Sequence, residues 1–321
     1  MAGTTLTTTS GITDQIQRYF DKKLLIQTLK TIVLDQFAFK APLPGKSGAK
    51  TIRFFRYPES NTTDVLGVTE GTLRTLAESK QLSLTSVDVA LAQYGQTVTI
   101  SDLLSAVELF STMEQATVQN GQDAALKVDE LLRNILGDST AIQLRYAGAA
   151  TNYATVGGTD DAMTALDILD AATNLRVNNA RPTGGYFTAI MAPEVARDLM
   201  NDDDWLEASK YGNPDNLFKG EVGRYMGVRV VATTNPYRQT TQHTYNAAGA
   251  IYSTFVVGDQ SYGGVNLATM SAYSPKMIIT QGADKYDPLG QYTTVGFKFY
   301  YGGAIINANH AVNIASITNY S

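Results

Sequence analysis

The sequence predicts an α+β protein that combines an extended N-terminal part, one long helix and a mixed α/β region ending in strands. Three observations support this prediction. A β-branched and aromatic run at 51–57 is followed by a long stretch without clear periodicity. Apolar residues at helical spacing then continue without proline from Leu103 to about Leu136. From residue 186 onward, short helix and strand patterns alternate, and strand patterns fill the C-terminal third.

The first 40 residues predict an arm and a short helix. Residues 1–11 are rich in Thr, Ser and Gly, a composition typical of a mobile chain end. Apolar residues recur every three to four positions over residues 12–28, which predicts an amphipathic helix. Pro42 and Pro44 then break the pattern.

Residues 41–100 predict a long two-stranded loop. After the strand at 51–57, residues 58–80 have no clear period and few apolar anchors, and strand character returns between Leu82 and Ile100. A lone hairpin is only marginally stable in water, so this loop must lie on another surface.

The longest predicted element is a helix over residues 102–137. Ser101 and Asp102 provide N-cap side chains, and Gly137 stands where a C-cap glycine belongs. Roughly 34 residues at 1.5 Å each would span about 50 Å, more than the width of a typical domain. Such a helix braces an elongated molecule.

The remaining elements alternate. Thr159 and Asp160 predict the start of a helix that ends near Val177, and Pro193 predicts the first turn of another helix. The predicted order after residue 177 is a strand at 186–191, a helix at 193–200, a helical turn at 221–225, and strands at 228–233, 251–257, 277–280, 293–301 and 304–317.

The composition is poor in charge and rich in tyrosine. Charged residues make up 17% of the chain, which has 18 tyrosines, whereas about 25% charge is ordinary. Protein–protein interfaces show the same depletion of charge and enrichment in Tyr. The net charge of −5 and the lack of a basic run argue against high-affinity nucleic-acid binding. The sequence contains neither a secretory signal nor an apolar run long enough to span a membrane.

No catalytic, cofactor-binding or metal site is expected from the sequence. Cysteine is absent, and His243 and His310 are too few for a histidine-rich metal centre. The acidic run at 202–204 lacks the alternation of a calcium loop, so we interpret it as a solvated turn. The glycines at 220–223 and 261–264 match neither phosphate-binding motif, and the chain has no G-x-S-x-G elbow.

Segments along almost the whole chain are similar to one family, and they occur in the family's order. The segments are FDKKLL (20–25), DQFAFKAPLP (35–44), AKTIRF (49–54), VTEGT (68–72), QYGQTVTISDLL (93–104), YFTAIMAPEVARDLMND (186–202), GEVGRYMGVRVVATTN (220–235), FVVGDQSYGGV (255–265) and DPLGQYTTVGFKFYYGGAIIN (287–307). With these segments, the chain resembles the major capsid proteins of tailed bacteriophages with the HK-97 fold, in particular those of the coliphage N-four type.

The resemblance implies a division of the chain and a shell function. Copies would assemble as pentamers and hexamers into an icosahedral head of the virion, made in the host cytoplasm, that encloses double-stranded DNA without sequence-specific binding. A portal protein and separate scaffolding or decoration proteins would be further partners, with no cofactor and no membrane. The implied parts are an N-terminal arm and short helix (1–40), an extended loop (41–100), a spine helix with peripheral elements (101–158), an axial domain with interleaved peripheral strands (159–300) and a C-terminal strand (301–321).

The candidate inter-subunit contacts lie mainly on the extended loop. Scattered charges there form either a solvated face or ion pairs between subunits, and tyrosines outside the core would anchor a neighbour. The candidates are Arg53, Arg56, Tyr57, Glu59, Asp64, Glu70, Arg74, Tyr94 and Tyr262. Lys50 and Lys80 flank the loop, but no constellation for a covalent cross-link accompanies them.

Three alternatives stay open at this point. An encapsulin-like compartment shell would keep the fold and enclose a cargo enzyme. A hydrolase would draw on the acidic run and the α/β elements. A tail-tube or surface-layer protein would form helical or sheet-like arrays.

Overall fold

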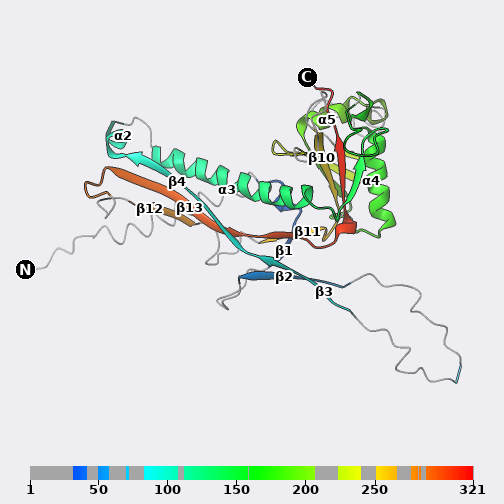
Figure 1. Cartoon of the computed structure of the whole chain (residues 1–321), viewed down its shortest axis with the longest axis horizontal. Helices are drawn as coiled ribbons and strands as arrows, with labels where there is room; N and C mark the ends of the chain where they lie inside the picture. Colours follow the sequence, from blue (N-terminus) through cyan, green and yellow to red (C-terminus); the bar gives the residue numbers. More distant parts are fainter. Residues whose placement is uncertain are drawn as a thin grey trace, which may run out of the picture.

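The described chain forms a long arm, a rounded α/β unit at one end of it and a hairpin beside it (Figure 1). The computed structural model describes residues 32–41, 50–57, 70–71, 83–107, 112–157, 159–206, 223–239, 251–265, 276–280, 282 and 287–320.

The arm is a helix packed along a three-stranded antiparallel sheet. α3 (Thr112–Gly137) lies against β4 (Ala92–Ser101) and β13 (Tyr292–Tyr301), and β12 (Lys276–Thr280) pairs with the other edge of β13. β4 and β13 pair over their full length of ten residues. Toward the free end of the arm, the helix and the sheet share a small apolar core of Ile100, Ala116, Met277 and Val295.

The predicted single helix over 102–137 is present as two helices, α2 (Asp102–Val107) and α3, and residues 108–111 lie outside the described part. α3 has 26 residues, which gives it a length of about 39 Å. Gly137 lies at the end of α3, as predicted, but it is the last helical residue and does not have a positive φ. Its hydrogen makes room for the ring of Tyr237, which a Cβ would overlap.

The α/β unit is built on a seven-stranded mixed sheet in the order β5-β15-β10-β6-β8-β7, with β9 paired to β10. Its strands are β5 (Gln143–Tyr146), β6 (Phe187–Met191), β7 (Arg224–Tyr225), β8 (Val228–Ala232), β9 (Tyr237–Gln239), β10 (Ile251–Val257) and β15 (Ala311–Ser316). Every residue of β6, β10 and β15 is buried, as in strands that are covered on both faces. The helices α4 (Ala165–Val177) and α5 (Pro193–Met200) pack their apolar side chains into the core of this unit.

A second core lies where the arm, the hairpin and a small sheet meet. The small sheet consists of β1 (Phe39–Ala41), β11 (Tyr262–Val265) and β14 (Gly303–Ile305), and the hairpin of β2 (Thr51–Arg56) and β3 (Thr85–Ala90). Ile52, Phe54 and Val89 point inward from the hairpin and pack in one cluster with Leu132 of α3. The segment predicted as one two-stranded loop therefore divides between two sheets, because β3 pairs with β2 whereas β4 pairs with β13.

Local signals explain where the predicted boundaries of the α/β region held and where they failed. α5 and β10 have the predicted bounds. α4 begins later than predicted, because Thr164 and Asp167 form a capping box while Thr159–Asp161 form the 3₁₀ turn η4. The predicted helical turn at 221–225 is wrong for its last two residues, which form β7. The predicted strand at 304–317 is broken by the 3₁₀ turn η5 (Ala308–His310).

Candidate functional site

The outward face of the hairpin carries an ion pair and exposed aromatic rings. Arg53 stands opposite Asp88 across the two strands, with Nε 2.5 Å from Oδ1 and Nη2 2.7 Å from Oδ2. Hydrogen bonding by Arg53 lowers the pKa of Asp88. Phe55 and Tyr57 follow Arg53 at every second position, and they are 57% and 65% exposed. This face therefore offers a neighbour both apolar area and a bidentate pair of fixed geometry.

The other candidates on the loop are only partly located. Arg56 is half-buried at the end of β2, and Glu70 lies in an exposed turn with Gly71, whose φ is +81°. Three candidates lie outside the described residues: Glu59, Asp64 and Arg74. The structure thus brings Arg53, Arg56 and Tyr57 together on one hairpin.

Tyr94 and Tyr262 differ in accessibility. Tyr94 is half-buried on β4, where its ring packs on Phe299 at 5.7 Å between centroids and faces Lys127 of α3. Tyr262 is only 1% exposed, and its hydroxyl donates to the carbonyl oxygen of Leu34 at 2.6 Å. The prediction of Tyr262 as an inter-subunit anchor is wrong, because the Tyr262 side chain is part of the core. Its strand, β11, lies between β1 and β14.

A groove of about 670 Å³ runs between α3 and the arm sheet. Its wall includes Tyr94, Asp123, Lys127, Glu130, Arg133 and Asn235. Lys127 pairs with Glu130 at 3.0 Å, and Arg133 donates to the side chains of Asn134 and Asn235. Side chains of both charges therefore line this groove.

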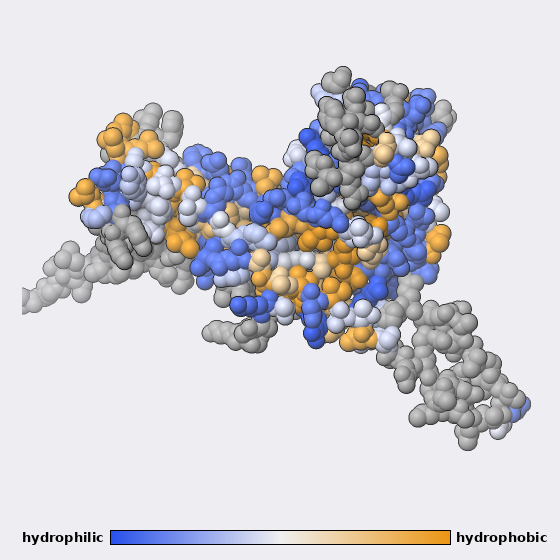
Figure 2. Space-filling view, in the orientation of Figure 1, coloured by the Kyte–Doolittle hydropathy of each residue, from blue (hydrophilic) through white to orange (hydrophobic). Residues whose placement is uncertain are grey.

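The free end of the arm exposes apolar side chains that are not covered by the described chain. Figure 2 shows this end as an orange patch where Figure 1 places α2. We call it the tip patch, and it consists of Leu103 (72% exposed), Leu104 (50%), Val107 (77%), Leu289 (79%) and Tyr292 (52%). The α2 part of the patch lies next to the part that contains Leu289 and Tyr292, because the Asp102 amide donates to the carbonyl of Gln291 at 2.9 Å. Exposed apolar clusters of this kind typically mark interaction sites.

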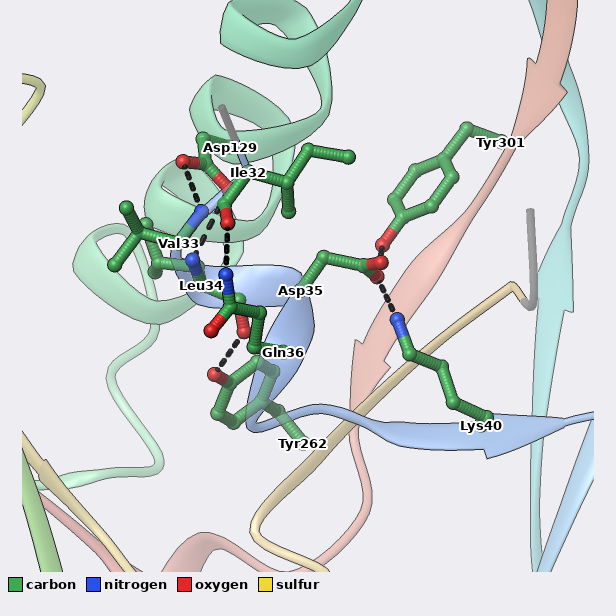
Figure 3. A network of polar contacts seen from close by, with 9 residues as sticks. All are labelled: Ile32, Val33, Leu34, Asp35, Gln36, Lys40, Asp129, Tyr262 and Tyr301. Carbon is green, nitrogen blue, oxygen red and sulfur yellow. Dashed lines mark hydrogen bonds and ion pairs between the residues drawn. The ribbon is translucent and has the colours of Figure 1, made fainter. Parts of the chain in front are cut away.

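A buried polar network was missed by the sequence reasoning (Figure 3). Asp129 of α3 is 3% exposed and faces the 3₁₀ turn η1 (Leu34–Gln36), which itself contains Asp35, 5% exposed. Asp35 forms an ion pair with Lys40 and accepts a hydrogen bond from the hydroxyl of Tyr301 at 2.7 Å. One feature of the sequence could have indicated this network. Asp129 is an acidic residue on the apolar stripe of a helix, because Ala125 and Leu132 lie on the same buried face.

The residues singled out for possible chemistry have structural partners. The carboxylate of Asp202 accepts the Ala165 amide at 2.6 Å and so caps α4. His310 Nδ1 lies 2.9 Å from the carbonyl oxygen of Asp259, and His243 lies outside the described part. Among the described residues, no group of three or more acidic or histidine side chains is placed to hold a metal ion. The helices in this same portion are too short or too polar to cross a membrane.

The comparisons with known proteins rest on structure. Neither the family models nor the curated proteins that were searched contain a match to this sequence. The capsid of Ralstonia phage GP4 is similar with a TM-score of 0.68 and 14% identity, covering 90% of this chain and 92% of that one. The capsid of cyanophage Pam1 gives 0.65 and 15%, covering 92% and 93%. A virus-like particle from Pyrococcus furiosus gives 0.54 and 10%, covering 93% and 99%. The chain therefore has an α+β capsid fold of the HK-97 type, the fold of tailed-phage shell proteins.

Proposed function

We propose that this chain is a major capsid protein that self-assembles into the icosahedral head shell of a bacteriophage and encloses double-stranded DNA. The observation that carries the proposal is the fold, which matches phage capsids over about 90% of both chains. The role we propose is structural, in keeping with the phage capsids to which the fold is similar.

The surfaces of the molecule support assembly from copies of the chain. The hairpin and the tip patch lie at separate places on the described molecule, and both expose large apolar side chains to solvent (Figures 1 and 2). A subunit with two remote contact surfaces joins several neighbours, and many weak contacts then stabilise one closed particle. We propose pentamers and hexamers as the building units.

The remaining partners follow from the proposed shell. We expect a portal protein, and scaffolding or decoration proteins, as further partners. The net charge of −5 suits a wall that confines DNA by enclosure. Strong, salt-sensitive DNA binding by the subunit would contradict that view of the inner face.

A second candidate is a compartment shell that holds a cargo enzyme. It is favoured by the similarity to the virus-like particle from Pyrococcus furiosus, whose chain is covered to 99%. The higher TM-scores belong to phage capsids, so we rank the phage shell first. Particles that copurify with a cargo enzyme and without DNA would reverse this order.

Negative-stain electron microscopy of the expressed protein tests the proposal directly. Capsomer rings or closed shells support it, helical or sheet-like arrays indicate a tube or surface layer, and a stable monomer at high concentration contradicts it.

A deletion variant lacking residues 58–80 tests the loop. It is expected to stay folded and soluble but to form no closed particles, and normal particles from it would refute the assembly role of this segment.

A further inference from the structure

Two arginines stand opposite each other at the β7 edge of the seven-stranded sheet. Arg224 of β7 pairs in register with Arg229 of β8, and both side chains are exposed. Residues directly opposite in an antiparallel pair project from the same face of the sheet, and like charges in that arrangement repel. On the other side of Arg229, β6 offers only the uncharged Thr188. Among the described residues, no ion pair includes either arginine, so the repulsion is not offset within the subunit.

The basic pair is held in a defined position by its surroundings. Met226 and Gly227 join the two strands, and their φ values of +46° and +86° are those of a tight two-residue hairpin turn. Arg176 of α4 donates to the carbonyl oxygen of Met226 at 2.8 Å, which fixes the turn. The guanidinium of Arg224 lies over the ring of Tyr186, 4.4 Å from its centroid. This contact orients the guanidinium through its face and does not use its N–H donors.

The opposite face of the same sheet edge carries exposed carboxylates. Tyr225 follows Arg224 in β7 and therefore projects to the other face, where its ring packs on Trp205 at 5.2 Å between centroids. Asp203 and Asp204 directly precede Trp205, and both are exposed. This is the face that α4 and α5 cover. One subunit thus presents a basic pair and an acidic pair on the two sides of one sheet edge.

We propose that Arg224 and Arg229 bind Asp203 and Asp204 of a neighbouring copy in a ring of subunits. The inference rests on the proposed shell function and assigns one contact within a capsomer. Opposite charges on two sides of a subunit suit a heterologous contact, which repeats around a ring until the ring closes. Guanidinium groups bind carboxylates through paired N–H donors, so the contact also fixes how neighbours are oriented. The carboxylates of the neighbour also offset the repulsion between the two arginines.

Charge reversal on each side, and on both sides together, tests the contact. Arg224→Glu with Arg229→Glu, and Asp203→Arg with Asp204→Arg, place like charges between copies. Each double variant is expected to raise the protein concentration needed for assembly by about a hundredfold or more. The chain with all four substitutions restores opposite charges and is expected to assemble near the concentration of the unmodified protein. Light scattering against protein concentration, with electron microscopy of the products, provides the readout.

The matched control keeps the charges and changes the side chains. Arg224→Lys with Arg229→Lys is expected to assemble within about tenfold of the unmodified concentration, because a lysine still pairs with a carboxylate but lacks the planar fork of arginine. Thermal unfolding of every variant shows whether its subunit is folded. If a reversal variant does not fold, the neutral pairs Arg224→Gln with Arg229→Gln and Asp203→Asn with Asp204→Asn replace it. Their effects on assembly are then expected to be less than additive when combined.

The outcomes separate this contact from other roles. Normal assembly of either reversal variant would overturn the proposal, and so would additive effects of the neutral pairs. If the chain with all four substitutions fails to assemble, the arginines meet a different partner and the proposal is wrong. A monomeric unmodified protein would refute the shell function itself, whereas particles that tolerate each reversal would refute this contact alone.

Discussion

Replacing apolar side chains of the tip patch by serine is expected to block assembly and leave the subunit folded. Leu103 and Val107 are 72% and 77% exposed, so Leu103→Ser and Val107→Ser remove little that is buried in the subunit. Complete burial of such side chains against a neighbour contributes about 2 kcal/mol each. Losing both therefore weakens one inter-subunit contact by about 4 kcal/mol, or roughly a thousandfold in its dissociation constant.

Light scattering against protein concentration, with electron microscopy of the products, measures this effect. The double serine variant is expected to remain unassembled at concentrations where the unmodified protein forms particles, and its thermal unfolding is expected to be unchanged. The control is Leu103→Met with Val107→Ile, which keeps the apolar area and is expected to assemble. If the serine variant assembled at the same protein concentration as the unmodified protein, the reasoning that the tip patch is buried between subunits would be refuted.

Three further predictions concern the subunit itself. Because the pKa of Asp129 is raised to about 6 in the folded protein, its contribution to the free energy of unfolding is fully present below pH 4 and is lost as pH rises through about 6. The loss amounts to up to about 3 kcal/mol. Asp129→Asn is expected to abolish this pH dependence in thermal unfolding measured across the same range. Gly137→Ala is expected to destabilise the fold by about 1–3 kcal/mol in urea despite the better helix propensity of alanine, because its Cβ would overlap the Tyr237 ring. Tyr301→Phe is expected to cost about 1–3 kcal/mol, since it leaves the buried Asp35 with one partner fewer.

Each of these predictions has an outcome that contradicts it. An unchanged pH dependence in Asp129→Asn would assign the titration to another group. A stabilised Gly137→Ala would mean that Tyr237 moves aside at little cost. No loss of stability in Tyr301→Phe would mean that the ion pair with Lys40 satisfies Asp35 by itself. Leu289→Ser, at a fully accessible position of 79% exposure, is the common control for stability and is expected to change it by less than about 0.5 kcal/mol.

Elements governed by local signals were predictable from the sequence. The helix Pro193–Met200 was predicted with its bounds because proline in the first turn marks its start. The strand Ile251–Val257 was predicted from a continuous apolar run. In both cases residues adjacent in the chain carry the whole signal.

Features that depend on remote partners were not predictable. β4 was assigned to the loop because nothing near it in the sequence indicates that it pairs with β13, about 200 residues later. Tyr262 was assigned to the surface because its burial depends on β1 and β14, two strands from distant parts of the chain. Leu103 and Val107 stand at the helical spacing of apolar residues, and periodicity alone does not reveal that both side chains are exposed. The network around Asp129 likewise joins five separate elements of the fold.

The junction between β3 and β4 has a geometric consequence for a shell. Leu91 alone separates the two strands, and its amide donates to the carbonyl of Lys50 at 2.8 Å, which ties the junction to the start of β2. Hairpin and arm therefore meet at a single corner, and this hydrogen bond holds the start of β2 against it. In an assembled surface, the angle at that corner would set how sharply neighbouring subunits lean toward each other, and with it the radius of the closed particle.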